Sequence, residues 1–450
     1  MKRFLSLFLA VLMLSSAAGC TKKEKGEMSS PPSEYLIAQA EYPETIPYPD
    51  EKASNFSDAY GIWEDARRSR WAEYKNIDTI QLSGFFESSI PQFLLGNDSA
   101  NPAYSPLNVY MALGMLAELT DGNSRRQILD LLGSDDIKTL RTQASAIWKA
   151  NYNDDGVTAA ILGSSLWLNE DIPFNQPVMD ILADYYYASS YRGEMGSAGF
   201  DEELQNWLND QTGGFLEEQA SQIKMEPDTV TTLASTVYFS AKWRHKFKEE
   251  NTEKMTFHAP DGDILCDFMN KKKASGTYYW GDRFTAVYLP FDSRTFEKMW
   301  FILPDEDTTP EDLLTDPQVM DLLFDNSGWK NYKPLLINMA IPKFDVTSQT
   351  DLCDGLKVLG ITDVFDSTVS DFSPMTSMEE IILSKAQHDV RVVIDEEGCT
   401  AAAYTVMVAA GGAMPPTEEV DFIADRPFLF AITSYDFLPL FVGIVNQPET

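Results

Sequence analysis

The feature that most restricts how this chain can fold is an uncharged run near its carboxyl end. From Cys399 to Met414 the sequence contains no charged residue and no proline, and Pro415-Pro416 follows. The acidic, turn-bearing flank Asp395-Glu396-Glu397-Gly398 precedes the run. Surface loops are normally polar and interrupted by turn residues, whereas a buried strand of this length is unusual. The segment therefore suits two states, an exposed loop and a strand.

The alternation of side chains along this run distinguishes its two faces. In a strand, successive side chains point to opposite sides. One side carries only small or apolar residues, namely Cys399, Ala401, Ala403, Thr405, Met407 and Ala409. The bulky Tyr404 lies on the other side. Such a strand could enter between existing strands with its small side against a core, although this segment alone leaves a simple buried hairpin strand as the alternative.

The amino end has the pattern of an export signal. Lys2 and Arg3 precede an apolar run over 4–14, and small residues lead to Cys20. This ending resembles the lipobox of bacterial lipoproteins, apart from Ala17 where that group prefers leucine. The resemblance implies lipidation of Cys20, which would anchor the chain to the cell envelope outside the cytoplasm. Ordinary secretion, with Cys20 incidental, is the alternative.

Composition divides the rest of the chain into a tether and one large domain. From Thr21 to about Asn55 the sequence is rich in Lys, Glu, Ser and Pro, which predicts a semi-extended tether. Aromatic residues at mostly helical spacing between Phe56 and Tyr74 predict an added helix packed on the main body. We therefore expect a signal at 1–20, a tether with an added segment at 21–77, and one domain at 78–450.

Helical patterns concentrate early in this domain and strand patterns late, which predicts an α+β fold with antiparallel sheets. The predicted helices are Leu107 to Leu119, Ser124 to Leu132 and Glu202 to Asn209, the second capped by Ser124 and ended by Gly133. The predicted strands are Leu233 to Phe239, Met299 to Leu303, Leu335 to Ile341, Val390 to Ile394 and Leu429 to Thr433.

The sequence offers little that could perform catalysis. It contains no G-x-S-x-G, H-E-x-x-H, P-loop or dinucleotide-binding pattern. Its three histidines and its cysteines lack the spacing of metal ligands, so we expect no metal and no cofactor. The acidic pairs Glu249-Glu250 and Glu396-Glu397 are interpreted as charge runs on a solvated face. A formal charge of −34 argues against a nucleic-acid partner.

The uncharged run and its flank also resemble the hinge of the serpin family, which has the form E-E-G-T-x-A-A-A-x-T. The matching residues are Glu396, Glu397, Gly398, Cys399, Thr400, Ala401, Ala402, Ala403, Tyr404 and Thr405. The family's carboxyl-terminal signature is matched by Asp425 to Phe430 and Pro439 to Pro448, and further motifs match in order from about residue 80. The resemblance implies helices packed around three mainly antiparallel sheets, with an exposed reactive loop at about 396–416.

Two departures from the family pattern concern residues that control insertion. Cys399 stands where the family usually has Thr or Ser, and it is still small enough to be buried. The resemblance places the region where the central sheet opens at Ser105, Trp243 and His388, together with two further positions. At these two positions the family has a serine and an asparagine. Here these positions are Asn108 and Ser235. The hydroxyl and amide are exchanged, so a hydrogen bond could persist with its partners reversed, and His388 would be the third member of the group.

The resemblance further implies a protein that is no enzyme but inhibits serine endopeptidases as a suicide substrate. A protease would cut the loop and be trapped as an acyl-enzyme while the loop inserts into a sheet. The family's spacing puts the cut between Gly412 and Ala413, to within about three residues. Small residues around this bond favour an elastase-like or subtilisin-like target. We expect a monomer that heparin does not activate. A non-inhibitory binding protein and an inhibitor of cysteine proteases are the alternatives.

Overall fold

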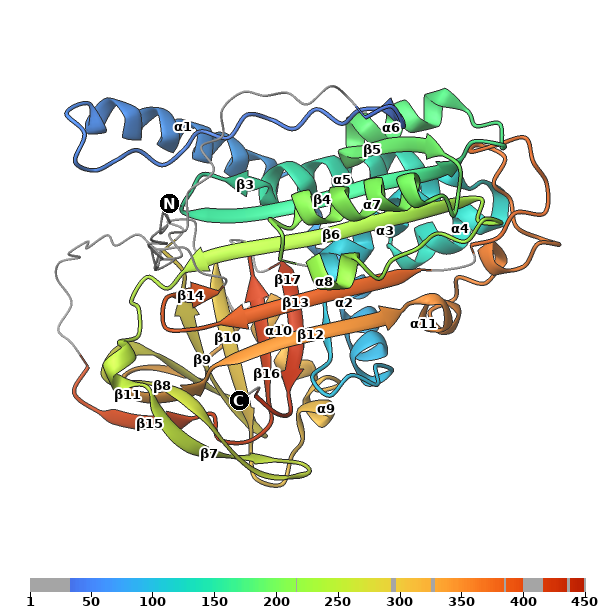
Figure 1. The fold of residues 1–450 in the computed structure, drawn as a ribbon. Coiled ribbons are helices and arrows are strands. Elements are labelled where there is room, and N and C mark those ends of the chain that lie inside the picture. The colour runs from blue at the N-terminus through green and yellow to red at the C-terminus, as the bar shows by residue number, and fades with distance from the viewer. Residues whose placement is uncertain are drawn as a thin grey trace, which may run out of the picture. The chain divides into compact units, whose positions relative to one another are not determined.

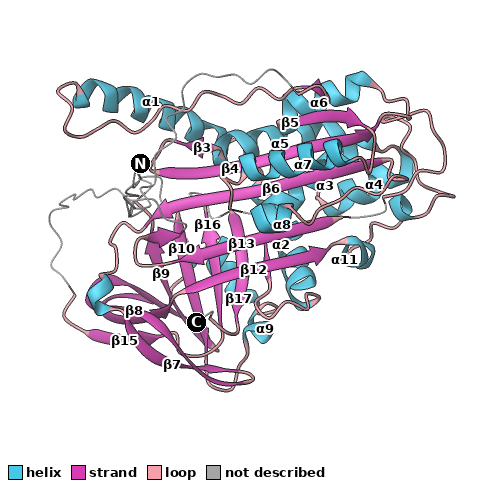
Figure 2. Cartoon of the chain, in the orientation of Figure 1, coloured by secondary structure: helices cyan, strands magenta, loops and turns pink. Residues whose placement is uncertain are grey.

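A computed structural model describes residues 33–215, 217–292, 297–324, 328–383, 386–399, 416–434 and 438–448. In these ranges the strands form two hydrogen-bonded sheets, one of eight strands and one of nine. Helices pack against them, so the chain is α+β as predicted (Figure 1, Figure 2). Residues from Tyr35 onward belong to one compact unit.

The first sheet contains β14, where the uncharged run begins. Its order is β1 (Leu36–Ala38), β5 (Ala188–Gly193), β4 (Thr158–Asn169), β6 (Thr231–Lys242), β14 (Gly398–Cys399), β13 (Gln387–Ile394) and β12 (Phe344–Asp351), with β3 (Asn153–Asp154) beside β4. β4 and β6 are antiparallel and pair along almost their whole length. The predicted strands at 233–239 and 390–394 lie within β6 and β13, which confirms them.

The second sheet is held together by one long strand. Its order is β15 (Glu419–Ile423), β11 (Tyr332–Pro342), β8 (Gly262–Trp280), β9 (Phe284–Pro290), β10 (Lys298–Pro304), β16 (Phe428–Thr433), β17 (Pro439–Val445) and β2 (Ala103–Tyr104), with β7 (Glu253–Ala259) beside β8. β8 pairs with β7 through its first half and with β9 through its end. A bulge opposite β11 near Lys273 separates these halves. The hydrogen bonds of β8 therefore join two of the three expected sheet regions into one network.

The helices are α1 (Phe56–Tyr74), α2 (Thr79–Leu95), α3 (Pro106–Leu119), α4 (Gly122–Leu131), α5 (Ile137–Asn151), α6 (Gln176–Tyr186), α7 (Ala198–Gln211), α8 (Glu217–Ala220), α9 (Pro310–Leu313), α10 (Pro317–Phe324) and α11 (Cys353–Val358), with 3-10 turns η1 (Glu249–Asn251) and η3 (Asp363–Phe365).

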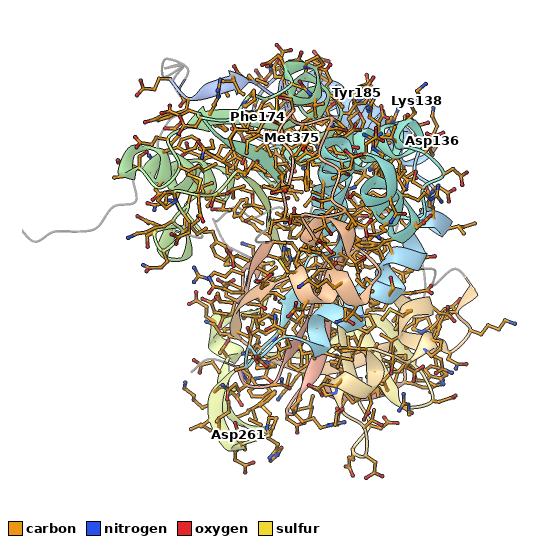
Figure 3. The ribbon with its side chains drawn as sticks, turned by 90° about the vertical axis from the view of Figure 1, so that its right-hand side faces the viewer. Asp136, Lys138, Phe174, Tyr185, Asp261 and Met375 are labelled. Atoms are coloured by element: carbon orange, nitrogen blue, oxygen red, sulfur yellow. The ribbon has the colours of Figure 1, made fainter. Side chains whose placement is uncertain are left out.

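Local signals explain where several helices begin. Asp136 caps α5, since its carboxylate accepts hydrogen bonds from the backbone of Lys138 and Thr139 (Figure 3). α4 begins at Gly122, two residues before the predicted cap Ser124. The Ser124 hydroxyl instead accepts a hydrogen bond from the backbone N–H of Asp371, 3.1 Å away. The predicted cap is therefore wrong, because this side chain fastens a distant loop.

α3 is the central helix of the core. Every residue of α3 except Ala112 is buried. A helix that is apolar around its whole circumference has to be covered on all sides. α3 packs against α4, α5, α6, β6 and β17, and thereby joins the helical layer to both sheets. Its first turn lies below β6, which places Asn108 near the middle of the first sheet.

From Tyr35 to Asn55, the segment predicted as a tether belongs to the compact unit. β1 pairs with β5 and extends the first sheet at its edge. Tyr42 packs against Trp148 and Tyr152, with ring centroids 5.0 and 5.4 Å apart. The predicted helix α1 is confirmed at Phe56–Tyr74 and buries Trp63. The domain thus begins near Tyr35, because aromatic residues spaced between the prolines supply the apolar contacts that the average composition hides.

The segment just before α6 is joined to a segment that lies about 200 residues later in the chain. Figure 3 shows Phe174, just before α6, close to Met375. The backbone N–H of Asn175 donates to the Met375 carbonyl over 2.9 Å, and Phe174 forms an isolated bridge with Thr376. In the ranges given above, no helix is long and apolar enough to cross a membrane.

Candidate functional site

The first sheet is interrupted between β6 and β13. Among the described strands, only the two residues of β14 stand between them in the order of pairing. β14 pairs with the last two residues of β6 and with the end of β13 (Figure 1). Among the residues that the structure describes, no strand pairs with the remaining length of β6 on this side. We call this space between β6 and β13 the gap.

β14 sits in the gap as the first two residues of an inserted strand would. Gly398 is opposite Lys242 and Cys399 is opposite Ala241, antiparallel to β6. Cys399 is also opposite Ile394 on β13, and its side chain is buried on the core side. A Cβ atom at residue 398 would collide with the Ala241 carbonyl oxygen. This close approach explains why glycine stands at the start of the strand.

Glu396, two residues before Gly398, is anchored rather than solvated. Glu396 is 8% exposed. Its carboxylate accepts hydrogen bonds from the Thr252 hydroxyl at 2.6 Å and from the Lys343 ammonium group at 3.0 Å. Burial alone would raise the pKa of Glu396, but these two donors outweigh burial and lower it. The interpretation of Glu396 as part of a solvated charge run is therefore wrong.

Glu397 and Trp243 complete this anchored end of the gap. The Glu397 carboxylate is paired with Lys246. The Glu397 carbonyl accepts from the backbone N–H of Trp243 at 3.0 Å. The indole N–H of Trp243 donates to the Asp395 carbonyl at 2.8 Å, and its ring stacks on Phe291. Trp243 thus fixes the hinge backbone at Asp395 and Glu397 through two hydrogen bonds.

The other residues predicted for sheet opening lie farther along the gap. Asn108 is on α3 and Ser235 is on β6. The Ser235 hydroxyl donates to the Asn108 side-chain oxygen, and the Ser164 hydroxyl lies 3.5 Å from that of Ser235. The serine and the amide are therefore in direct contact with exchanged roles. This pair ties the central helix to the edge of the gap.

His388 contacts a different partner from the one expected. Its Nε2 accepts a hydrogen bond from the backbone N–H of Ser105 at 3.0 Å, so the ring proton is on Nδ1. The Ser105 hydroxyl donates to the Leu440 carbonyl at 2.6 Å. Burial lowers the pKa of His388 to about 4. The ring of His388, a residue of β13, therefore acts as a neutral hydrogen-bond acceptor for Ser105.

A small cavity unites these groups under the gap. Its volume is about 50 Å³, and Asn108, Leu233, Ser235, Ala386 and His388 are among the residues around it. It lies between β6 and β13 and above α3. The structure thus brings Asn108, Ser235 and His388 around one space, with Ser105 behind His388, and places Trp243 at the opposite end of β6.

Several predicted residues cannot be placed. Thr400, Ala401, Ala402, Ala403, the proposed bond between Gly412 and Ala413, and Cys20 lie outside the described residues. The two anchors of Glu396, Thr252 and Lys343, were not predicted. In the described ranges, no group of three or more His, Cys, Asp or Glu residues could hold a metal ion.

Comparison with known proteins agrees with this geometry. The profile of the family described as "Serpin (serine protease inhibitor)" matches residues 88–448. The chain is 26% identical over 367 residues to Serpin-ZX of Arabidopsis thaliana, covering 78% of this chain and 93% of the relative. It is 27% identical over 359 residues to leukocyte elastase inhibitor of Xenopus tropicalis, covering 75% and 90%. The crystal structure of tengpin, a thermophilic serpin, in its native state superposes with a TM-score of 0.72 at 25% identity, covering 82% and 95%.

Proposed function

Since the chain belongs to the serpin family, we propose that it inhibits serine endopeptidases as a suicide substrate whose cut loop fills the gap. The observation that supports this proposal is β14, which already occupies the first positions between β6 and β13. The uncharged run follows β14 directly in the sequence. A strand that continued from Cys399 would have a partner on both sides, because β6 and β13 flank the gap.

The register of β14 indicates which loop residues would face the core. Continuing it places Ala401, Ala403, Thr405 and Met407 on the side of buried Cys399. Their partners on β6 and β13 would be Phe239 with Val392, Val237 with Val390, Ser235 with His388, and Leu233 with Ala386. Thr405 would thus reach the polar group of the cavity, and Met407 its apolar wall.

Insertion would supply the free energy for trapping. About a dozen new backbone hydrogen bonds at roughly 0.5–1.5 kcal/mol each amount to on the order of 10 kcal/mol, before burial of side chains is added. That is comparable with the whole stability of a typical protein domain. An acyl-linked protease that moves with the inserting strand could therefore be distorted.

We further propose that the cut falls between Gly412 and Ala413. The neighbouring Ala410 and Gly411 are also small. A protease with a shallow apolar specificity pocket, elastase-like or subtilisin-like, accepts such residues, whereas a trypsin-like enzyme requires Lys or Arg. One matched relative is itself named an elastase inhibitor. This similarity supports the proposed target class.

The decisive experiment compares two single charges in the same loop. Ala403→Glu would bury an unpaired carboxylate on the core side, so the variant should be cut without trapping the protease. Thr400→Glu, the control, puts the same charge on the outward side and should still trap it. Each variant is incubated with subtilisin-type and elastase-type proteases and read on a denaturing gel. If Ala403→Glu forms the covalent complex as efficiently as Thr400→Glu, the proposed inward face is wrong.

We also propose that the chain is exported and lipidated at Cys20. The charged and apolar residues before Cys20 support this location. Mass spectrometry of the amino-terminal peptide should find a lipid on Cys20, and Cys20→Ser should release the protein from the membrane fraction. An unmodified, membrane-free wild-type protein would contradict the anchor without affecting the inhibitory mechanism.

A further inference from the structure

A cavity of about 510 Å³ lies between the segment before α1, α1 itself and the end of α5. Its walls come from residues 41–46, from α1 side chains three and four residues apart, and from Lys149, Tyr152 and Tyr187. Most of these residues precede residue 88, where the match to the family profile begins. The lining residues include none from β6, β13 or β14, so the cavity is separate from the gap. Volumes of about 300–1,000 Å³ are typical of small-molecule sites.

One wall of the cavity is a fixed stack of aromatic rings. The Trp148 ring is stacked between those of Tyr152 and Tyr187, with centroids 4.5 and 3.7 Å away. The Trp148 indole N–H donates to the Leu162 carbonyl on β4 at 2.8 Å, which fastens the stack to the first sheet. Tyr187 holds its place with a φ of 53°, a left-handed conformation that is unfavourable for a residue with a side chain. With Tyr42 packed against the stack, the wall is preformed and suits a flat ring.

Two half-buried cations, Arg70 of α1 and Lys149 of α5, also line the cavity. Arg70 Nη1 donates to the Tyr152 carbonyl at 3.2 Å and to the Asn153 side-chain oxygen, which are both uncharged acceptors. Among the described residues, no carboxylate forms an ion pair with either cation. Burial lowers the pKa of Arg70, and the charge of Asp155 opposes this effect. The two positive charges therefore lack a bound counter-charge.

The carboxylates around the cavity do not supply that counter-charge. Glu41 and Glu44 line it but are exposed, where water and salt screen their charges. Glu73 is half-buried, and its carboxylate accepts a hydrogen bond from the Asn76 amide at 3.1 Å. The half-buried charge of the lining is therefore positive on balance, with two cations against the single carboxylate of Glu73.

We propose that this cavity binds a small carboxylate that carries an aromatic ring. The ring lies against Tyr152 and Tyr187, and the carboxylate is held by Arg70 and Lys149. Guanidinium and ammonium groups bind carboxylates through charge-assisted hydrogen bonds, which are stronger than those between uncharged groups. The site belongs to this chain's own added segment and does not depend on the proposed inhibitory function.

The test compares three probes of one ring system by isothermal titration calorimetry on the full-length protein. Naphthylacetate, naphthylacetamide and naphthylethylamine carry a negative charge, no charge and a positive charge. Naphthylacetate should bind with a Kd at least about tenfold lower than the other two, because it alone brings a charge opposite to that of both cations. Equal affinities, tighter binding of the amine, or no saturable binding of any probe would overturn the proposal.

Two variants assign the binding to this cavity. Lys149→Gln removes a charge without removing any hydrogen bond made within the described residues, and it should raise the Kd of naphthylacetate about tenfold while leaving that of naphthylacetamide unchanged. Arg70→Gln should have the same effect. Since Arg70 also binds the backbone of Tyr152, the melting temperature of this second variant is recorded beside its affinity.

A matched control removes the same charge from the same helix. Lys138 is exposed in the first turn of α5 and does not line the cavity (Figure 3). Lys138→Gln should therefore bind naphthylacetate as the wild type does. If Lys149→Gln and Lys138→Gln bind this probe equally tightly, the carboxylate is not held at Lys149 and the assigned site is wrong.

Discussion

At the scale of single residues, the contact between Asn108 and Ser235 is a polar link in an otherwise apolar core. Ser235 donates and Asn108 accepts, so the buried Asn108 side chain has its partner in the half-buried Ser235 hydroxyl. Removing one partner of a buried hydrogen bond costs about 1–3 kcal/mol, because the other is left unsatisfied. The exchange of serine and amide between the two positions keeps the bond intact.

We predict that the two positions behave as a unit. Asn108→Ser and Ser235→Asn should each lower the free energy of unfolding by about 1–3 kcal/mol, and the double exchange should recover part of that loss. Denaturant unfolding of the four proteins measures the coupling. Losses that simply add would show that the contact between these two side chains contributes nothing to stability.

His388 should make the stability depend on pH. Its pKa is lowered to about 4 in the folded protein, against an ordinary value near 6.5, so the unfolded chain binds the extra proton more readily. The contribution is complete above pH 6.5 and is lost as the pH falls from 6.5 to 4, a difference on the order of 3 kcal/mol. The nearby Tyr104 ring is uncharged in this range.

The measurement compares wild type with His388→Asn, whose side-chain amide cannot take up a proton in this range. Melting temperatures are recorded between pH 4 and 7. Carboxylates titrate in both proteins, so the prediction concerns their difference: the wild type should lose more stability than the variant on acidification. Parallel curves would mean that the His388 ring is protonated as easily in the folded protein as in the unfolded chain.

At the scale of elements, the sequence predicted long apolar patterns well and context-dependent segments poorly. β6, β13 and α1 were recognisable because apolar or aromatic residues recur along each of them, and α3 because it is apolar along its length. β1 was missed, because a three-residue edge strand has no period of its own and forms by pairing with β5. Tyr42 was missed for a similar reason: it lies in a stretch whose composition predicts a tether, and its packing depends on distant aromatic residues.

The hinge around Glu396 and Gly398 also contains one feature that the sequence could predict and one that it could not. Gly398 could be predicted as a turn or close-approach residue, and the structure gives the reason in the Ala241 carbonyl. The anchoring of Glu396 could not be predicted, because Thr252 and Lys343 lie 144 and 53 residues away along the chain. Two adjacent glutamates read alike in sequence, but only one of them is buried.

At the scale of the whole molecule, the described part of the first sheet is incomplete. β6 and β13 flank the gap, and the one described strand between them has two residues. The family resemblance supplied the order of motifs and the idea of insertion, while the structure supplies the register of β14 and the contacts that anchor Glu396. The sequence could not reveal the contacts of Phe215 with Tyr238 and Arg391, because these residues meet only after the strands and α7 are in place.

Thermal stability before and after loop cleavage tests this account most directly. A non-target protease cuts the loop near Gly412, and amino-terminal sequencing of the released fragment identifies the bond. The freed segment should enter the gap and add on the order of 10 kcal/mol, which for a domain of this size raises the melting temperature by about 10–15 °C. A melting temperature that stays level or falls after verified cleavage would contradict loop insertion and with it the proposed inhibitory mechanism.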